Sequence, residues 1–249
     1  MKLKDLIMKQ KTHKISWTDE KVNLLWDFYS NNPHYKKTYF SYQAGTQIID
    51  YIDQFIGLKK VKTILDYGCG AGHLLKALLP MTKPTNQIIC ADTSEKSIEK
   101  IKEQFSHHPQ INKTYILGKE NNEIPNNIAD LVICLEVVEH LNDFNLEKVV
   151  TEAYRILKKG GFFFVSTPNS EDLDAAMRLC PDCGCIFHQW QHMRSWTTET
   201  LSSYMSEKNF NTYHIRATNV FSSRFERRFP KLFPNRFKNT PNLIYIGKK

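Results

Sequence analysis

Short apolar runs alternate with amphipathic stretches along most of the chain after about residue 43. VKTILDYG and QIICAD have the composition of strands, and each is followed by a stretch with helical spacing, HLLKALL and SEKSIEKIKEQF. KTYILG is the third predicted strand. ADLVICLE, the fourth, is nearly all apolar, as a strand covered on both faces is, and FFFVST is the fifth. The alternation predicts an α/β fold, with a mostly parallel sheet and helices on both faces.

Size and composition fit one domain. The chain has 249 residues, 41% of them hydrophobic, which is enough for one core. It contains no run of eighteen apolar residues, and its first residues lack the pattern of a signal peptide. We therefore expect a cytoplasmic protein with a helical cap segment at 1–42 and a main domain at 43–249, which carries a Cys/His-rich insertion at about 170–195.

Three glycines follow the first predicted strand in the stretch ILDYGCGAG. Gly68, Gly70 and Gly72 would permit a tight turn and leave room for a ligand beside the backbone. Asp66 precedes them, and Asp92 ends the second strand, where a carboxylate can accept hydrogen bonds from ribose hydroxyls. The pattern fits either a cofactor cradle or a structural turn beside two solvated aspartates.

In this glycine motif and its setting, the chain resembles the class I S-adenosylmethionine-dependent methyltransferases from about residue 43 onward. The resemblance implies a Rossmann-like sheet of seven mostly parallel strands, with the last strand antiparallel. It also implies that the three glycines surround the methionine part of S-adenosylmethionine. Asp66 would then support the turn, Asp92 would hold the ribose, and Glu136, past the fourth strand, would join the cofactor site.

A second group of polar residues follows the fourth predicted strand in LEVVEHL. If this segment is helical, Glu136, Glu139 and His140 share one face. Two carboxylates and an imidazole can hold a divalent cation or supply a general base. The alternative is the polar first turn of a helix, where the helix dipole favours glutamates.

EVVEHL, the later TPN segment and the H-x-x-x-W-T pattern that starts at His192 together resemble two enzyme groups. These are the ubiquinone-biosynthesis O-methyltransferases and the small-RNA 2′-O-methyltransferases. By resemblance to the RNA enzymes, Glu136, Glu139, His140 and His192 would be catalytic and would bind Mg²⁺ or a similar divalent ion at the acceptor hydroxyl. A cation there lowers the cost of removing the hydroxyl proton, which favours O-methylation.

The segment CPDCGCIFHQWQH predicts a zinc site. Cys180, Cys183, His188 and His192 follow the C-x2-C-x4-H-x3-H spacing of a zinc knuckle, and Cys185 is a further candidate. If His192 serves the acceptor site instead, zinc would need the other four residues. The alternative is a reduced, metal-free loop. In either case we expect a structural lid over the acceptor pocket.

The two ends of the chain carry further candidates. Tyr39, Tyr42 and Gln43 lie in an aromatic stretch that either reaches the acceptor or packs as a helix on the sheet edge.

Near the other end, a basic aromatic segment covers residues 221–238, with phenylalanine at every fourth position from Phe221 to Phe237. Six basic residues stand against one acidic residue there, in a chain of net charge +8. The segment could contact a membrane surface, a carrier-linked substrate or RNA. It could equally place phenylalanines in a core and arginines in water.

We therefore expect a transferase, namely a methyltransferase that O-methylates a small or carrier-linked metabolite such as a sugar or a polyprenyl phenol. An RNA 2′-O-methyltransferase is the alternative enzyme. A zinc-dependent binding or scaffold protein with the same fold is the alternative of another class. The expected location is the cytoplasm, with peripheral membrane contact left open.

Overall fold

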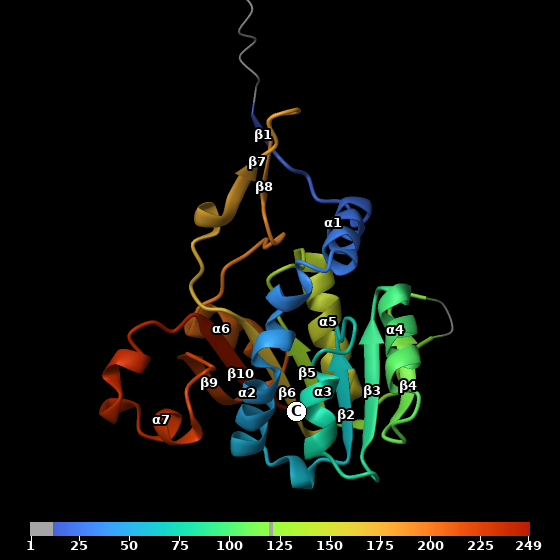
Figure 1. Ribbon diagram of the computed structural model, residues 1–249. Coiled ribbons are helices and arrows are strands. Elements are labelled where there is room, and N and C mark those ends of the chain that lie inside the picture. Colours follow the sequence, from blue (N-terminus) through green and yellow to red (C-terminus); the bar gives the residue numbers. More distant parts are fainter. Residues whose placement is uncertain (1–11, 120–121) are drawn as a thin grey trace, which may run out of the picture.

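The computed structural model describes residues 12–119 and 122–249, and a seven-stranded sheet forms its centre (Figure 1). The strand order is β4-β3-β2-β5-β6-β10-β9. Strands β2 to β6 are parallel, and β10 runs antiparallel to both of its neighbours. The α/β sheet of seven strands with an antiparallel last strand is thereby confirmed. The strands are β2 (Thr63–Tyr67), β3 (Gln87–Asp92), β4 (Ile111–Ile116), β5 (Ala129–Leu135), β6 (Leu157–Pro168), β9 (Asn211–Thr218) and β10 (Asn242–Lys248).

Helices cover both faces of the sheet. Consecutive residues of one strand serve opposite faces, since Ile64 belongs to the core under the first helix group and Leu65 to the core under the second. The first group is α2 (Phe40–Phe55), α3 (Leu75–Leu78) and α4 (Glu95–Phe105). The second is α5 (Asp143–Ile156) and α6 (Thr198–Glu207).

The order in which strands are added to the sheet reverses between β2 and β5. From β2 the chain moves outward to β3 and β4, then returns to pair β5 with the other side of β2. The carboxyl ends of β2 and β5 therefore meet at a topological switch point, where α/β sheets bind ligands.

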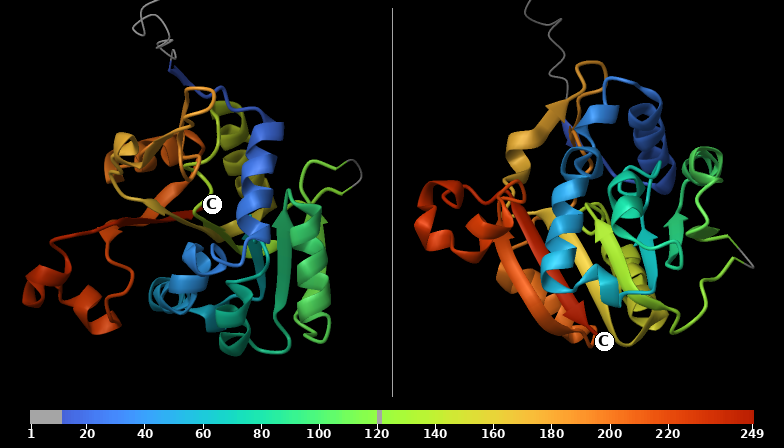
Figure 2. Two further views of the ribbon diagram at one scale, coloured as in Figure 1. Left: turned by 45° about the horizontal axis from the view of Figure 1, so that its top comes forward. Right: turned by 60° about the horizontal axis from the view of Figure 1, so that its bottom comes forward.

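A small second sheet stands beyond that edge (Figure 2). It joins β1 (His13–Lys14) to β8 (Cys185–His188) and β7 (Met177–Leu179), in the order β1-β8-β7. Together with α1 (Asp19–Asn31) it forms a cap above the main sheet. The cap thus combines the predicted N-terminal segment, whose residues 1–11 lie outside the described residues, with the predicted insertion. Short 3₁₀ helices complete this region at η2 (Lys36–Thr38) and η5 (Leu173–Ala176), and others follow α2 and α3 at η3 (Leu58–Lys60) and η4 (Leu79–Met81).

The segment after β5 corrects one expectation. Residues 136–142 form a turn rather than a helix, and α5 begins only at Asp143, where the Asn142 side chain caps it. The backbone of Glu136 has a positive φ of 50°, which is incompatible with a right-handed helix. Glu136 therefore does not share a helix face with Glu139 and His140.

The basic aromatic segment lies at the far edge of the sheet, beside β9 (Figure 1). It contains α7 (Arg224–Arg228), η6 (Pro230–Leu232) and η7 (Pro234–Arg236), broken at its prolines as expected. Arg224 and Arg227 form ion pairs with acidic residues of α2. In the described part of the chain, no helix combines the length and apolar character needed to cross a membrane.

Candidate active site

The glycine turn after β2 opens into a cavity. All three glycines have positive φ, at 80°, 50° and 79°. A Cβ added at Gly68 would lie 2.8 Å from Val137 Cγ2, and one at Gly72 would lie 2.9 Å from Phe105 Cε2, whereas one at Gly70 would meet nothing within 4 Å. Packing thus explains Gly68 and Gly72. Only Gly70 leaves open space, and it does so toward the cavity.

Two aspartates lie beneath this turn, Asp66 buried and Asp92 partly exposed. Asp92 accepts hydrogen bonds from the backbone N–H groups of Gly70 and Ser94, each at 2.8 Å, and so joins the glycine turn to the start of α4. Asp66 is 3% exposed, and its Oδ2 has no hydrogen-bond partner among the described residues. Burial, followed by the nearby charge of Asp92, raises the pKa of Asp66 to about 7. An unpartnered buried carboxyl beside an open cradle fits a site that gains its partner from a ligand.

The cavity has a volume of about 790 Å³ and lies under the cap. Gly68 and Gly70 line its floor, and aromatic side chains from the cap line much of the remainder. Tyr39 lines it as expected, whereas Tyr42 and Gln43 do not. The aromatic side chains are Trp17, Trp26, Tyr29, Tyr35, Tyr39 and Trp190.

Glu139, His140 and His192 converge on the same cavity. Each offers one ligand atom, and these three atoms lie within 4.8 Å of one another. Glu139 Oε2 accepts a hydrogen bond from Thr167 Oγ1 at 3.0 Å, while its Oε1 lies 3.5 Å from His140 Nε2. Glu136 lies apart from this group and accepts a hydrogen bond from Ser166 Oγ at 2.7 Å. Three of the four residues matched to the RNA enzymes therefore come together.

Burial sets the charges in this group. The pKa of Glu139 is raised well above its usual range by burial and then by the charge of Glu136. Burial, with a smaller effect from the neighbouring His192, lowers the pKa of His140 to about 3, so its imidazole is neutral at pH 7. Burial also raises the pKa of Glu136 to about 7, against the opposing hydrogen bond from Ser166. A bound cation would favour the ionised form of these carboxyls.

The five predicted zinc ligands do not assemble. Cys180, Cys183 and Cys185 lie in and beside the turn between β7 and β8 as free thiols. His188 ends β8, three residues beyond Cys185, which separates the two Cα atoms by about 10 Å in an extended strand. Its ring and that of His192 instead approach Glu171. A zinc knuckle requires a turn between its cysteines and its histidines, whereas in this structure strand β8 occupies that position.

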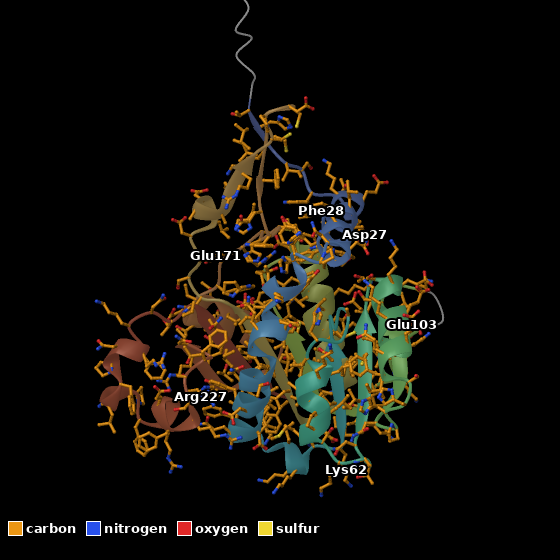
Figure 3. All side chains as sticks on the ribbon, viewed as in Figure 1. Asp27, Phe28, Lys62, Glu103, Glu171 and Arg227 are labelled. Carbon is orange, nitrogen blue, oxygen red and sulfur yellow. The ribbon has the colours of Figure 1, made fainter. Side chains whose placement is uncertain are left out.

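Sequence reasoning missed Glu171, which follows β6 (Figure 3). Glu171, His188 and His192 form the second of the two compact groups of possible metal ligands in the described part of the chain, and they share His192 with the first. A carboxylate three residues after Pro168 was the available signal, but a position in a loop does not reveal its partner.

The cap also contributes polar contacts that the sequence did not indicate. Trp26 Nε1 donates a hydrogen bond to Gln191 Oε1 at 3.2 Å, and Gln191 Nε2 donates to the backbone oxygen of His140 at 2.7 Å. The Trp26 ring meets the His140 ring edge-on, with centroids 5.0 Å apart. Helix α1 thus reaches the EVVEHL turn both directly and through Gln191.

Comparison with known proteins identifies the family. Residues 39–215 match the family described as methyltransferase domain. The chain is 32% identical over 115 residues to a ubiquinone biosynthesis O-methyltransferase of Pelagibacter ubique, covering 45% of this chain and 44% of that protein. It is 26% identical over 191 residues to the small RNA 2′-O-methyltransferase of Arabidopsis thaliana, covering 68% of this chain and 20% of that protein.

The chain thus spans less than half the length of these two relatives. Among solved structures, the Burkholderia thailandensis 1,6-didemethyltoxoflavin-N1-methyltransferase with bound S-adenosylhomocysteine shares the fold. Its TM-score is 0.64 at 14% identity, over 96% of this chain and 93% of that one. The family match covers most of the chain, and the sheet and glycine turn agree with it. The chain therefore belongs to the methyltransferase-domain family, as its resemblance to the S-adenosylmethionine-dependent enzymes indicated.

Proposed function

We propose that this methyltransferase transfers a methyl group to a hydroxyl of a small or carrier-linked metabolite, such as a sugar or a polyprenyl phenol. The observation that carries the proposal is the convergence of Glu139, His140 and His192 in the cavity that also holds Gly70. A hydroxyl needs a cation or a base to give up its proton, whereas a neutral amine does not. The relatives named for O-methylation add support.

The residues around the glycine turn fit S-adenosylmethionine, which supplies an electrophilic methyl group on a sulfonium. Gly70 leaves the space for close approach to the backbone. The pKa of buried Asp66 and that of Glu136, which lines the cavity, are both raised to about 7, so a cationic ligand would stabilise their ionised forms. Asp92 already orders the turn by accepting the backbone N–H of Gly70. These residues would bind the cofactor and orient its methyl group toward the acceptor end.

At the acceptor end, Glu139, His140 and His192 would hold a divalent ion such as Mg²⁺, which when bound lowers the pKa of the acceptor hydroxyl. His140 is neutral and can offer a lone pair. Thr167 fixes Glu139 from one side, and the backbone N–H of Met193 donates to the Glu139 backbone oxygen at 2.8 Å from the other. In the transfer itself, the acceptor oxygen bonds to the methyl carbon, the carbon–sulfur pair stays on sulfur, and the hydroxyl proton leaves to a base.

Calorimetry tests the cofactor half of the proposal. Gly70→Ala should weaken S-adenosylmethionine binding at least 10-fold, because the new methyl group enters the cradle. Gly57→Ala is the matched control, since Gly57 has a similar positive φ of 81° and lies outside the cavity. Equal binding by both variants would remove the cradle from the proposal.

A transfer assay tests the acceptor half. Extracted metabolites are incubated with the protein and S-adenosylmethionine carrying a radioactive methyl group, with and without a chelator. Labelled product that resists acid and base as an ether, and that forms poorly with Glu139→Gln, supports the proposal. Transfer only to nitrogen, or transfer unaffected by Glu139→Gln, contradicts it.

An RNA 2′-hydroxyl is the second candidate acceptor. It is favoured by the presence of three of the four residues matched to the small-RNA enzymes within one compact group. The basic aromatic segment does not line the cavity, so an RNA would have to extend from the cavity to the sheet edge. Binding of short RNA that weakens steeply between 50 and 200 mM salt, with methylation of its terminal ribose, would favour this candidate.

A further inference from the structure

Glu171 contacts the Nδ1 edge of the His192 ring. His192 Nδ1 lies 2.5 Å from Glu171 Oε2, a short hydrogen-bond distance. A carboxylate accepts hydrogen bonds, so Nδ1 is the nitrogen that carries the proton in this pair. In a neutral ring the other nitrogen, Nε2, then has a free lone pair. The contact therefore selects one of the two tautomers of His192.

His188 supports the same carboxylate and is almost completely buried, at 3% exposure. Its Nδ1 accepts the backbone N–H groups of Trp190 at 3.3 Å and of His192 at 3.1 Å. The lone pair of Nδ1 is thus occupied, and in the neutral ring the proton must lie on Nε2. That Nε2 faces Glu171 Oε1 at 3.5 Å, and the His188 ring stacks on the His192 ring with centroids 4.6 Å apart.

With its proton on Nε2, His188 has no free lone pair on either ring nitrogen with which to bind a metal ion. Nδ1 accepts hydrogen bonds from two backbone N–H groups, and Nε2 carries the proton. Although Glu171, His188 and His192 are close enough to surround an ion, their hydrogen-bonding pattern is that of a support. The three residues form a chain of contacts that ends at His192 Nε2.

The backbone around this support is strained. The described chain has five non-glycine residues with positive φ, and three of them, Glu136, Ser170 and Gln191, flank the site. Ser170 directly precedes Glu171, and its N–H donates to the Trp196 backbone oxygen at 2.8 Å. Gln191 directly precedes His192 and donates to the His140 backbone oxygen. Such strain persists where surrounding contacts impose it, often at functional sites.

We propose that Glu171, supported by His188, is a positioning residue that holds His192 with its Nδ1 protonated and presents its Nε2 to the acceptor site beside Glu139 and His140. The inference rests on the proposed function for the use of that nitrogen, as ligand or as base. A carboxylate behind an imidazole stabilises the positive charge that develops when the ring binds a cation or takes a proton. At other metal sites, loss of a carboxylate that positions a histidine ligand typically lowers metal affinity or activity about 10- to 100-fold.

The first test reads the tautomers directly in metal-free protein. Long-range ¹H–¹⁵N NMR at pH 8 should show His192 protonated at Nδ1 and His188 protonated at Nε2. Glu171→Gln should convert His192 to a mixture of tautomers, because an amide can either donate or accept. Asp174→Asn is the control, since it removes one negative charge from the same loop and should leave the His192 signals unchanged. His192 protonated at Nε2 in the unaltered protein would overturn the proposal.

A second test separates positioning from metal ligation. Mn²⁺ titrated into the protein should broaden the His140 and His192 ring signals with one equivalent. In Glu171→Gln the affinity should fall about 10- to 100-fold while the stoichiometry stays at one. A second equivalent that depends on Glu171 and His188 would instead make them ligands and overturn the proposal. Because the tautomer measurement needs neither metal nor acceptor, it stands even if the proposed O-methylation fails.

Discussion

Asp66 makes the cofactor-free protein less stable at neutral pH than in mild acid. Its carboxyl is buried without a partner for Oδ2, and burial raises its pKa from 3.8 to about 7. Between these two values the unfolded chain has released the Asp66 proton and the folded chain has kept it. Stability therefore falls as pH rises through this window and levels off above the folded pKa. A difference of about 3 pKa units corresponds to about 4 kcal/mol at pH 8, as an upper bound.

Asp66→Asn should remove this loss, because an amide does not ionise. Relative to the unaltered protein, the variant should gain thermal stability progressively from about pH 4 to about pH 7. The upper bound of about 4 kcal/mol corresponds to a gain in Tm of roughly 8–16 °C, at roughly 2–4 °C per kcal/mol for a chain of this size. Thermal unfolding followed by circular dichroism at pH 4, 5, 6, 7 and 8, without cofactor, measures it.

Asp130→Asn supplies a control of opposite sign. Burial raises the pKa of Asp130, but hydrogen bonds from Lys158 and from the backbone of Thr63 and Lys62 outweigh burial and lower the pKa overall. The ionised form of Asp130 therefore stabilises the folded chain. Asp130→Asn should lower stability at neutral pH, and this difference between the variant and the unaltered protein should disappear as pH falls through the folded pKa of Asp130. A Tm difference for Asp66→Asn that is constant from pH 4 to pH 8 would refute the reasoning about the unpartnered carboxyl.

Three further predictions concern the cap, the α2 edge and the basic aromatic segment. Trp26→Leu removes the ring contact with His140 and the hydrogen bond to Gln191, so the KM for the acceptor should rise about 10-fold while S-adenosylmethionine affinity in calorimetry stays the same. Arg227 is 3% exposed and paired with Asp50, which keeps Arg224 as a partner, so Arg227→Met should lower the free energy of unfolding in urea by about 1–3 kcal/mol. The exposed Arg228→Met should change it by less than about 0.5 kcal/mol. Phe225 is 57% exposed, and if the segment contacts anionic membranes, Phe225→Ser should reduce co-sedimentation with phosphatidylserine vesicles several-fold, while equal sedimentation would argue against that contact.

The sheet was predictable because its signals are local. VKTILDYG has the composition of a strand, ADLVICLE that of a strand covered on both faces, and β2 and β5 occur there. The glycine turn was predictable for the same reason, although the distinction between Gly70 and its two neighbours depends on Val137 and Phe105, which come from elsewhere in the fold.

The details of the acceptor site were not predictable, because they depend on backbone geometry between elements. The spacing of Glu136, Glu139 and His140 indicated one face of a helix. The positive φ of Glu136 is incompatible with that helix at its first residue. The knuckle spacing indicated zinc, and the extended conformation of β8 separated the histidines from the cysteines. The contact of Glu171 with His192 joins two loops whose approach is fixed by tertiary structure, including the pairing of Asn169 with Trp196.

The cap consists of two segments that are about 170 residues apart in the sequence, and two register pairs join β1 to β8 within the described residues. A sheet of this size opens at a much lower free energy than the seven-stranded core. We therefore expect the acceptor to enter the cavity, and the methylated product to leave it, through a local opening of the cap that does not require global unfolding. Turnover would be limited by this gate if transfer is fast, and hydrogen exchange at Ile15, whose N–H bonds to Ile186 at 2.9 Å, would report its rate. The same arrangement lets the acceptor preference change through the cap alone, while the sheet and glycine turn keep their cofactor.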